Sequence, residues 1–173
     1  MSAVGIPPFD PSAPRSRYLK LLEPVVRTPF GRRFGIDFAA RVDPWLLRVS
    51  RGRFGAFIGA PTALLTTTGA KSGEERSAAV LYFSDGADVI LIASNFGRER
   101  HPGWYHNIKA HPEATMQRGG VSAAYAGSEV TDASERERLF VMADLLYKGY
   151  ADYRERTAAV GREIPLLRLT LAP

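Results

Sequence analysis

Residues 62–94 read TALLTTTGAKSGEERSAAVLYFSDGADVILIAS, three short runs of β-forming residues separated by turns that contain glycine. This alternation predicts strands over residues 62–68, 77–83 and 89–94, with a hairpin at Asp85-Gly86. Three later segments have the same character, residues 114–118, 122–128 and 166–171, and Gly119-Gly120 marks a second hairpin. Six short strands joined mostly by tight turns are more economically closed into a small barrel than left with exposed edges.

Helical spacing of apolar residues marks the chain before these strands. Tyr18, Leu22 and Val25 predict a helix that ends at Thr28-Pro29. A second stripe joins Phe38, Val42, Trp45 and Val49. Asp43-Pro44 resembles an N-cap and first helical position within that stripe, so a kink or a fresh start is expected there. The chain up to Pro14 is rich in proline and is expected to be a loose tail.

Later helices are predicted from caps and breakers. Residues 103–110 are expected to form one short helix that stops before Pro112. Ser134 and Glu137 have the spacing of a capping box, which predicts a helix to about residue 146, and a second helical stretch follows through Tyr153. The order of elements predicts one α+β domain, with a tail and amphipathic arm over residues 1–53 and a barrel over residues 54–173.

Composition and charge narrow the class of protein. The 173 residues include no cysteine, which excludes disulfides, thiolate metal sites and a cysteine nucleophile. With no signal peptide and no long apolar run, the chain is expected to be cytoplasmic. Of the net charge of +5, the excess lies in residues 1–53, which hold ten Lys or Arg against four Asp or Glu. Such an arm can attract nucleic acid, anionic lipid or a polyanionic ligand, or can be a solvated helix face.

A glycine-bounded turn follows the first predicted strand. Residues 66–76 read TTTGAKSGEER, and a turn of this kind exposes backbone N–H groups beside Ser72, Lys71 and Arg76. Those donors could hold a phosphate or a carboxylate through charge-assisted hydrogen bonds. The segment is not a P-loop, because the required earlier glycine and following helix are missing. The alternative is an exposed hairpin turn with ordinary surface cations.

The end of the third strand, ASNFG at residues 93–97, leads into HPGWYHN at residues 101–107. Polar groups at a strand end suit a ligand site, and Trp104 and Tyr105 offer flat apolar surface to a ring system. The alternative for Trp104 is a plug in the core. His101, His106 and His111 are five residues apart and do not share a helix face, so no metal site is predicted.

Tyrosines at intervals of three mark the last helical stretch. Tyr147, Tyr150 and Tyr153 would form one aromatic wall, which either packs in the core or covers a hydrophobic substrate pocket. No hydrolase triad and no paired-carboxylate motif stands out. These patterns favour binding of a flat anionic cofactor over acid–base hydrolysis.

Four segments in this order make the chain resemble the deazaflavin-dependent nitroreductase family, whose members also reduce quinones and activated alkenes. They are LLTTTGAKSGEER at 64–76, ASNFG at 93–97, HPGWYHNIKAHP at 101–112 and the spaced tyrosines. The resemblance spans roughly residues 45–173. It implies a split β-barrel like that of flavin-binding oxidoreductases and a site for coenzyme F420, an 8-hydroxy-5-deazaflavin with an oligoglutamate tail.

The resemblance also assigns residues to that site. Those implied to bind the cofactor are Ala70, Lys71, Ser72, Arg76, Ser77, Ala78, Ala79, Val80, Leu81, Ile92, Ala93, Ser94, Asn95, Gly103, Trp104, Tyr105, His106, Asn107 and Tyr150. Those implied to shape the acceptor pocket are Leu81, Ser94, Trp104, Tyr147, Tyr150 and Tyr153. Ser94 and Tyr150 are the candidate catalytic residues, meeting negative charge on the acceptor or delivering a proton.

Two positions depart from the family pattern. The family commonly has arginine where this chain has Ala70, and proline where it has Ala79. A missing cation would weaken the hold on the acidic tail, and a missing proline would loosen the return strand.

The alternatives to an F420-dependent reductase are an FMN-dependent oxidoreductase of the same fold and a non-catalytic deazaflavin carrier. The expected partner is a small-molecule electron acceptor. No nucleic acid is expected, peripheral membrane contact through the arm is an option, and the chain is expected to be a monomer or a homodimer.

Overall fold

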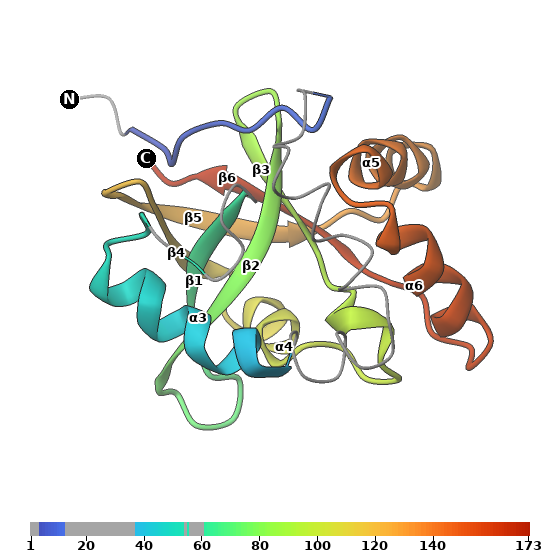
Figure 1. Cartoon of the computed structure of the whole chain (residues 1–173), viewed down its shortest axis with the longest axis horizontal. Coiled ribbons are helices and arrows are strands. Elements are labelled where there is room, and N and C mark those ends of the chain that lie inside the picture. The colour runs from blue at the N-terminus through green and yellow to red at the C-terminus, as the bar shows by residue number, and fades with distance from the viewer. Residues whose placement is uncertain (1–3, 13–36, 54, 56–60) are drawn as a thin grey trace.

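The computed structural model describes residues 4–12, 37–53, 55 and 61–173 (Figure 1). The helix predicted before Thr28-Pro29 lies outside these residues. The described residues form six strands: β1 Thr62–Thr68, β2 Glu75–Asp85, β3 Asp88–Ile92, β4 Glu113–Arg118, β5 Val121–Glu129 and β6 Leu166–Leu171. Neighbouring strands are antiparallel and close into a barrel in the order β1-β2-β3-β6-β5-β4. The predicted α+β class, the barrel and both hairpins are confirmed.

Helices cover two sides of this barrel. They are α3 Asp37–Val49, α4 Gly103–Ala110, α5 Ala133–Leu146 and α6 Gly149–Ala158, with a 3-10 turn η2 at Asn95–Gly97. In Figure 1, α3 lies against the β1–β2 side and α5 and α6 lie together on the opposite side. α4 packs against β1 and β5 near one end of the barrel. Within the described residues, no helix is long and apolar enough to cross a membrane.

Two apolar clusters meet at strands β3 and β6. Leu91 and Leu167 belong to the cluster that fills the barrel, whereas their neighbours Ile90 and Leu166 join a second cluster with α5 and α6. Successive side chains of a strand point to opposite faces, so both faces of these strands are buried. This explains why both segments are nearly continuous apolar runs. β5, by contrast, alternates exposed residues with partly buried ones, of which Tyr125 is fully buried.

The segment at residues 4–12 is ordered against the barrel, so the prediction of a loose tail is wrong there. Ile6 is buried, its N–H donates to the Tyr125 hydroxyl at 2.9 Å, and Tyr82 donates its hydroxyl to Pro7 O at 2.5 Å. Phe9 pairs with the backbone of Ser84. This proline-rich stretch is held by one buried isoleucine and by hydrogen bonds to the hydroxyls of two core tyrosines, and the local composition does not reveal these contacts.

Two helix starts differ from their predictions. The fresh start at Asp43-Pro44 is wrong, because α3 runs through Pro44 as one helix, with Leu47 packed in the interior. Burial of its inner face outweighs the local cost of the proline. The N-cap of α5 is Asp132 and not Ser134, since Asp132 Oδ1 accepts from Glu135 N at 2.8 Å. Asp132 and Glu135 have the same spacing as the predicted box, two residues earlier.

Candidate cofactor-binding site

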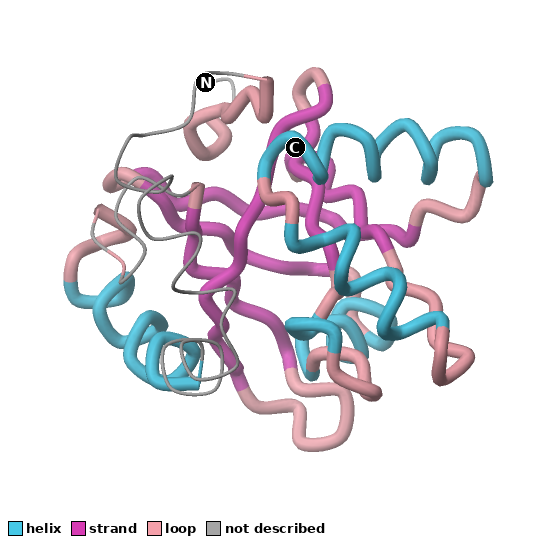
Figure 2. The backbone as a smooth tube through the Cα atoms, turned by 45° about the vertical axis from the view of Figure 1, so that its right-hand side comes forward, coloured by secondary structure: helices cyan, strands magenta, loops and turns pink. Residues whose placement is uncertain are grey.

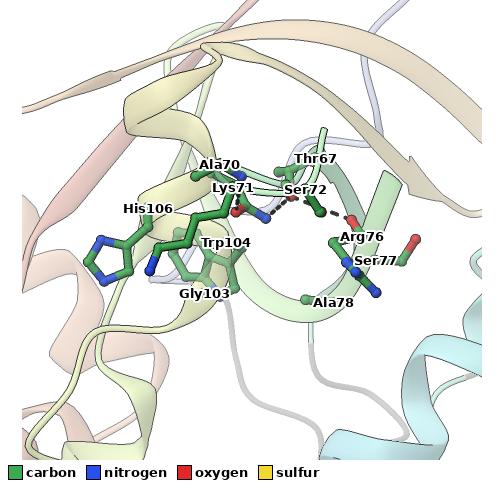
Figure 3. Close-up of a pocket in the computed structure, with 12 residues that line it drawn as sticks. Thr67, Ala70, Lys71, Ser72, Arg76, Ser77, Ala78, Gly103, Trp104 and His106 are labelled. Atoms are coloured by element: carbon green, nitrogen blue, oxygen red, sulfur yellow. Dashed lines mark hydrogen bonds between the residues drawn. The ribbon is translucent and has the colours of Figure 1, made fainter. Parts of the chain in front are cut away.

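A cleft of about 870 Å³ lies between the turn that joins β1 to β2 and the first turn of α4 (Figure 3). The described residues that line it are Thr67, Gly69, Ala70, Lys71, Ser72, Arg76, Ser77, Ala78, Gly103, Trp104, His106 and Asn107. In Figure 3, Lys71 extends toward His106 on one side, and Arg76 and Ser77 lie on the other. The cleft therefore has cations at both sides and an aromatic ring in its wall.

The turn beneath the cleft is shaped by its two glycines. Gly69 N donates to Glu74 O at 2.8 Å, and Gly73 N donates to Gly69 O at 2.8 Å. Gly73 has a φ of +69°, a conformation that glycine adopts without strain. A Cβ on Gly69 would lie 2.6 Å from Ser72 Oγ, so the hydroxyl folds tightly over that position. The sequence GAKSG thus closes a compact loop that presents Lys71 outward.

Asn107 joins α4 to this turn. Its Oδ1 accepts from Ala70 N at 3.0 Å, and its Nδ2 donates to Thr67 Oγ1 at 2.9 Å. Both atoms of the amide therefore bind the wall formed by β1 and its following turn, so Asn107 ties α4 to that wall across one end of the cleft.

The cations of the cleft are accessible. Arg76 Nη2 pairs with Glu74 Oε2 at 2.7 Å, and both side chains are well exposed. An exposed ion pair of this kind is worth about 0–1 kcal/mol, so Arg76 can exchange Glu74 for a ligand anion at little cost. Arg48 of α3 lies beside this wall without lining the cleft: its Nη2 donates to Ser77 Oγ at 2.8 Å and lies 3.9 Å from Glu75 Oε1. No motif in the sequence links Arg48 to the turn, and only the packing of α3 on β2 reveals it.

The structure brings together one part of the residues implied by the family resemblance. Ala70, Lys71, Ser72, Arg76, Ser77, Ala78, Gly103, Trp104, His106 and Asn107 line the cleft. Thr67 and Gly69 line it as well, and were missed because they lie before the charged part of the turn. The remaining residues lie outside its lining: Ala79, Val80, Leu81, Ile92, Ala93, Ser94, Asn95, Tyr105, Tyr147, Tyr150 and Tyr153.

The end of β3 has an unusual backbone. Ala93 and Ser94 are buried, and Asn95 and Phe96 adopt positive φ values of 47° and 57°. Buried Arg162, from the loop before β6, donates to the carbonyls of Ala93 and Ser94. Sequence reasoning missed Arg162, because nothing near it in the chain marks a site.

Tyr105 turns away from the cleft. Its hydroxyl donates to Glu129 Oε2 at 3.1 Å, and Lys109 Nζ lies 2.8 Å from the same oxygen. Burial and the Glu129 carboxylate raise the pKa of Tyr105. The side chains of Tyr105 and Lys109 thus tie this helix to β5, whereas Trp104 and His106 line the cleft.

The three tyrosines form one cluster, as predicted, although not on one helix. Tyr147 ends α5 in an extended conformation, whereas Tyr150 and Tyr153 lie on α6. Their ring centroids are 5.5 to 6.1 Å apart, and the hydroxyls of Tyr147 and Tyr153 are 3.4 Å apart. Gly149 permits this fold, since a Cβ there would lie 2.2 Å from the Tyr147 ring. Tyr150 and Tyr153 are only 4% exposed, and burial raises the pKa of both.

Comparison with known proteins gives one family. The family described as F420H(2)-dependent quinone reductase matches residues 39–170, which is more than half of the chain. An F420H(2)-dependent quinone reductase of Mycobacterium tuberculosis (strain ATCC 25618 / H37Rv) is 36% identical over 137 residues, 75% of this chain and 88% of the relative.

Solved structures that resemble this chain agree with this family assignment. One described as an F420-H2 dependent reductase has a TM-score of 0.56 and 34% identity, covering 63% of this chain and 93% of its own. Another, described as a domain-swapped dimer, has a TM-score of 0.57 and 30% identity, covering 75% and 96%. The split-barrel fold and the resemblance are confirmed, and FMN is not needed as an alternative cofactor. The chain belongs to the F420H2-dependent quinone reductase family and is an oxidoreductase with coenzyme F420 as its cofactor.

Proposed function

We propose that this chain transfers a hydride from reduced coenzyme F420 to a quinone, and that nitroaromatic compounds and activated alkenes are further acceptors. The observation that carries the proposal is the cleft, whose lining includes Lys71 and Arg76 from the turn and Trp104 from α4. A phosphate and an oligoglutamate tail complement these cations, and a flat ring complements the indole. Family membership supports the same cofactor.

The charged turn fits the anionic part of F420. Lys71, Arg76 and Ser72 would hold the phosphate and the tail, with the neighbouring turn backbone around them. Arg48 extends the positive field along the same wall through its contact with Ser77. Because Ala70 brings no cation to this turn, Arg48 would partly compensate for it.

The bound cofactor supplies the hydride chemistry, while the protein supplies orientation, exclusion of water and electrostatics. Residues of β2 from Ser77 to Leu81 and the β3 end from Ile92 to Asn95 would line the deazaflavin. Gly103 to Asn107 would close over it. Asn107 prepares this wall before binding, since its amide joins α4 to the turn.

Acceptor binding would use Leu81, Trp104 and the tyrosine cluster. Tyr147 is the half-exposed member of that cluster, so it offers the most surface to a flat acceptor. Negative charge that develops on a quinone oxygen would be met by the Ser94 hydroxyl or by Tyr150. Burial raises the pKa of Tyr150, which keeps its proton in place through the neutral range.

The direct test is oxidation of reduced F420 by the purified protein, with menadione, a nitroimidazole and an activated enone as separate acceptors. We expect quinone turnover to be fastest, because the matching family is described by its quinone reductase activity. Cofactor affinity is measured in parallel, with FMN as the control ligand. F420 binding without turnover of any acceptor would support a carrier instead, and absence of F420 binding would refute the proposal.

Two further proposals concern assembly and location. We propose a homodimer, for which the similar structure described as a domain-swapped dimer is the support, and light scattering of the full chain tests it.

Peripheral contact with anionic membrane is proposed from the outer face of α3, where Trp45 is 62% and Val49 67% exposed beside Arg48. If the chain stays in the supernatant with anionic vesicles at low salt, the membrane proposal is wrong.

A further inference from the structure

We infer that Arg162 is a positioning residue for the cofactor site, fixing the end of β3 and the start of α4 in the arrangement that binds F420. The inference rests on the proposed function. Arg162 lies in the loop between α6 and β6, and it is 8% exposed. It lines no part of the cleft, so its influence passes through the residues that it holds.

The guanidinium joins two ends of one loop. Nη2 donates to Ala93 O at 2.5 Å, and Nη1 donates to Ser94 O at 3.1 Å and to Arg98 O at 2.7 Å. Nε donates to His101 Nδ1 at 3.0 Å. Arg162 therefore contacts the chain just before η2, just after it and again before α4.

The loop between these contacts needs support. Asn95 and Phe96 both have left-handed backbone conformations, which residues other than glycine rarely adopt and which persist only where the surroundings hold them. Asn95 Nδ2 donates to Arg100 O at 2.8 Å within the loop, and α6 packs against η2 from outside. Arg162 adds hydrogen bonds to the backbone on both sides of η2, at Ser94 and at Arg98.

The last contact connects Arg162 to the cleft. His101 is followed by Pro102, the N-cap of α4, and then by Gly103 and Trp104, which line the cleft. A shift of His101 would change where the first turn of α4 begins. Arg162 thus sets the relation between the β3 end, where Ser94 lies, and the wall that carries Trp104.

Arginine suits this position better than lysine. Its planar fork reaches four acceptors in different directions, whereas an ammonium is a single point of donation. All four acceptors are neutral, so the contacts with the described residues serve to hold backbone and imidazole, not to neutralise a carboxylate.

The His101 contact makes the arrangement sensitive to acid. Nδ1 accepts only while it carries no proton, and protonation would place a second cation beside Arg162. Burial, Arg162 and His106 lower the pKa of His101, while Glu129 raises it. Tyr105 of α4 also faces the imidazole, with ring centroids 4.9 Å apart. The contact is therefore intact at neutral pH and is lost as pH falls below the usual range of histidine.

The first experiment compares Arg162→Lys with Arg154→Lys in the full chain. Arg154 is a partly buried arginine of the same region that pairs with Asp144 and does not reach the loop. We expect Arg162→Lys to weaken F420 affinity about tenfold, the effect of a loop that adopts its binding arrangement only about one tenth of the time. Arg154→Lys should change the melting temperature but not the affinity. Equal F420 affinity in wild type and Arg162→Lys would overturn the inference.

The second experiment follows F420 affinity from about pH 8 to about pH 5. His101→Asn keeps an acceptor near the position of Nδ1 and does not titrate, so we expect it to lose the acid-dependent fall in affinity. His111→Asn is the matched control and should keep the wild-type profile. Ionisation of F420 itself affects wild type and both variants equally, so the comparison uses only the differences between their pH profiles. If His101→Asn and wild type have the same profile, the His101 link is wrong.

A third readout needs no cofactor. Amide hydrogen exchange of residues 93–107 should be faster in Arg162→Lys than in Arg154→Lys, because the loop and the start of α4 lose their common anchor. Unchanged exchange would refute the positioning role. Failure of wild type to bind F420 would refute the proposed function instead, so the two failures are distinguishable.

Discussion

Lys71 and Arg76 are the residues that the cofactor proposal depends on most directly. Replacing both with alanine removes two exposed cations beside the turn. We expect F420 affinity to fall by about 1–3 kcal/mol in total, less than two charged hydrogen bonds of about 1.5–3 kcal/mol each, because water screens both side chains. Fluorescence titration measures the loss, and added salt should weaken the wild-type complex more than that of the variant.

The matched control is a second double alanine variant that loses the same two positive charges at positions away from the cleft. Arg51 and Arg53 are exposed cations outside the cleft lining, and their double alanine variant should bind F420 as wild type does. If both double variants lose the same affinity, the effect is one of overall charge. Unchanged affinity in the Lys71 and Arg76 variant would remove the clamp from the proposal.

Tyr150 tests whether the tyrosine cluster supplies a proton. Because burial raises its pKa, Tyr150 stays protonated past the ordinary pKa of about 10, and turnover should show no loss of this acid below that pH. We expect Tyr150→Phe to lower turnover only a few-fold, since water can deliver the proton. Tyr153→Phe is the control, because its hydroxyl contacts Tyr147 within the cluster. Loss of turnover with every acceptor, at intact F420 affinity, would identify Tyr150 as an obligatory donor.

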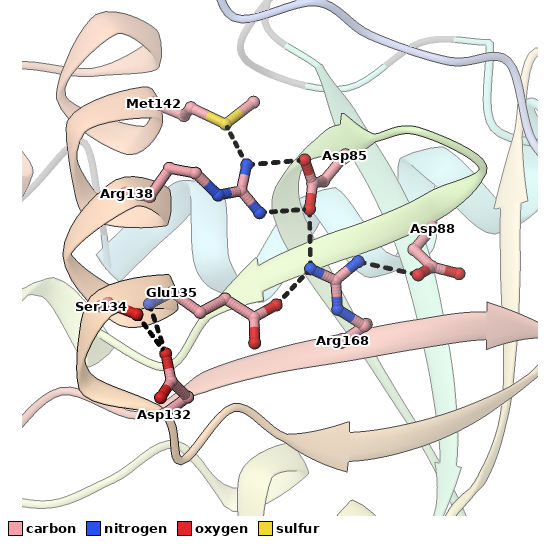
Figure 4. Close-up of polar contacts among 8 residues, drawn as sticks. All are labelled: Asp85, Asp88, Asp132, Ser134, Glu135, Arg138, Met142 and Arg168. Atoms are coloured by element: carbon pink, nitrogen blue, oxygen red, sulfur yellow. Dashed lines mark hydrogen bonds and ion pairs between the residues drawn. The ribbon is translucent and has the colours of Figure 1, made fainter.

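Strands β2, β3 and β6 are tied to α5 by one polar network (Figure 4). Asp85 accepts two hydrogen bonds from Arg138, at 2.8 and 2.9 Å, and one from Arg168 at 2.7 Å. Arg168 also pairs with Asp88 and Glu135. Arg138, together with Arg168, holds the pKa of Asp85 well below its usual range.

The network predicts how stability depends on pH. The Asp85 side chain is 19% exposed, so we expect Asp85→Asn to lower the free energy of unfolding by about 1–3 kcal/mol at pH 7. The pKa of Asp85 is lower in the folded state than in the unfolded state. Its ion pairs therefore stabilise the fold in full above the unfolded-state pKa, and this stabilisation begins to be lost below about pH 4. Denaturant unfolding of both proteins should therefore give curves that converge toward acid. A gap that stays constant from pH 7 to about pH 2 would contradict the role assigned to the Asp85 carboxylate.

Strands were predictable here because their signals are local. The period of apolar residues and the glycine turns place β1 and β6 at the predicted bounds. β2 is longer than predicted, because Glu75 and Asp85 keep backbone pairing although their side chains are polar. Contacts between distant segments gave no such signal. Arg162 lies 69 residues from Ala93 in sequence, and Asn107 lies 37 from Ala70, so only the closed barrel brings them together.

The whole barrel has a functional end and a structural end. In Figures 1 and 2 the β1–β2 turn lies at one end, and residues 4–12 lie at the other. There Ile6 joins the barrel core, and burial raises the pKa of Tyr82 to about 12 while its hydroxyl donates to Pro7 O. Residues 4–12 form hydrogen bonds with β2 and β5, and none of them is among the described residues that line the cleft. Stability and cofactor affinity should therefore be separable.

Deleting residues 1–9 tests that separation. The deletion exposes the space that Ile6 fills, and it removes the partners of the Tyr82 and Tyr125 hydroxyls. We expect the free energy of unfolding to fall by about 2–5 kcal/mol, because burial of one isoleucine and two buried hydrogen bonds are lost together. F420 affinity, measured well below the lowered melting temperature, should stay within about twofold, since a structural end contributes nothing to the ligand contacts. Val4→Ala is the control, because Val4 is 74% exposed, and it should change neither quantity. An unchanged free energy of unfolding would show that residues 4–9 do not close the barrel. A large loss of affinity at unchanged stability would mean that the two ends are coupled through β1 and β2.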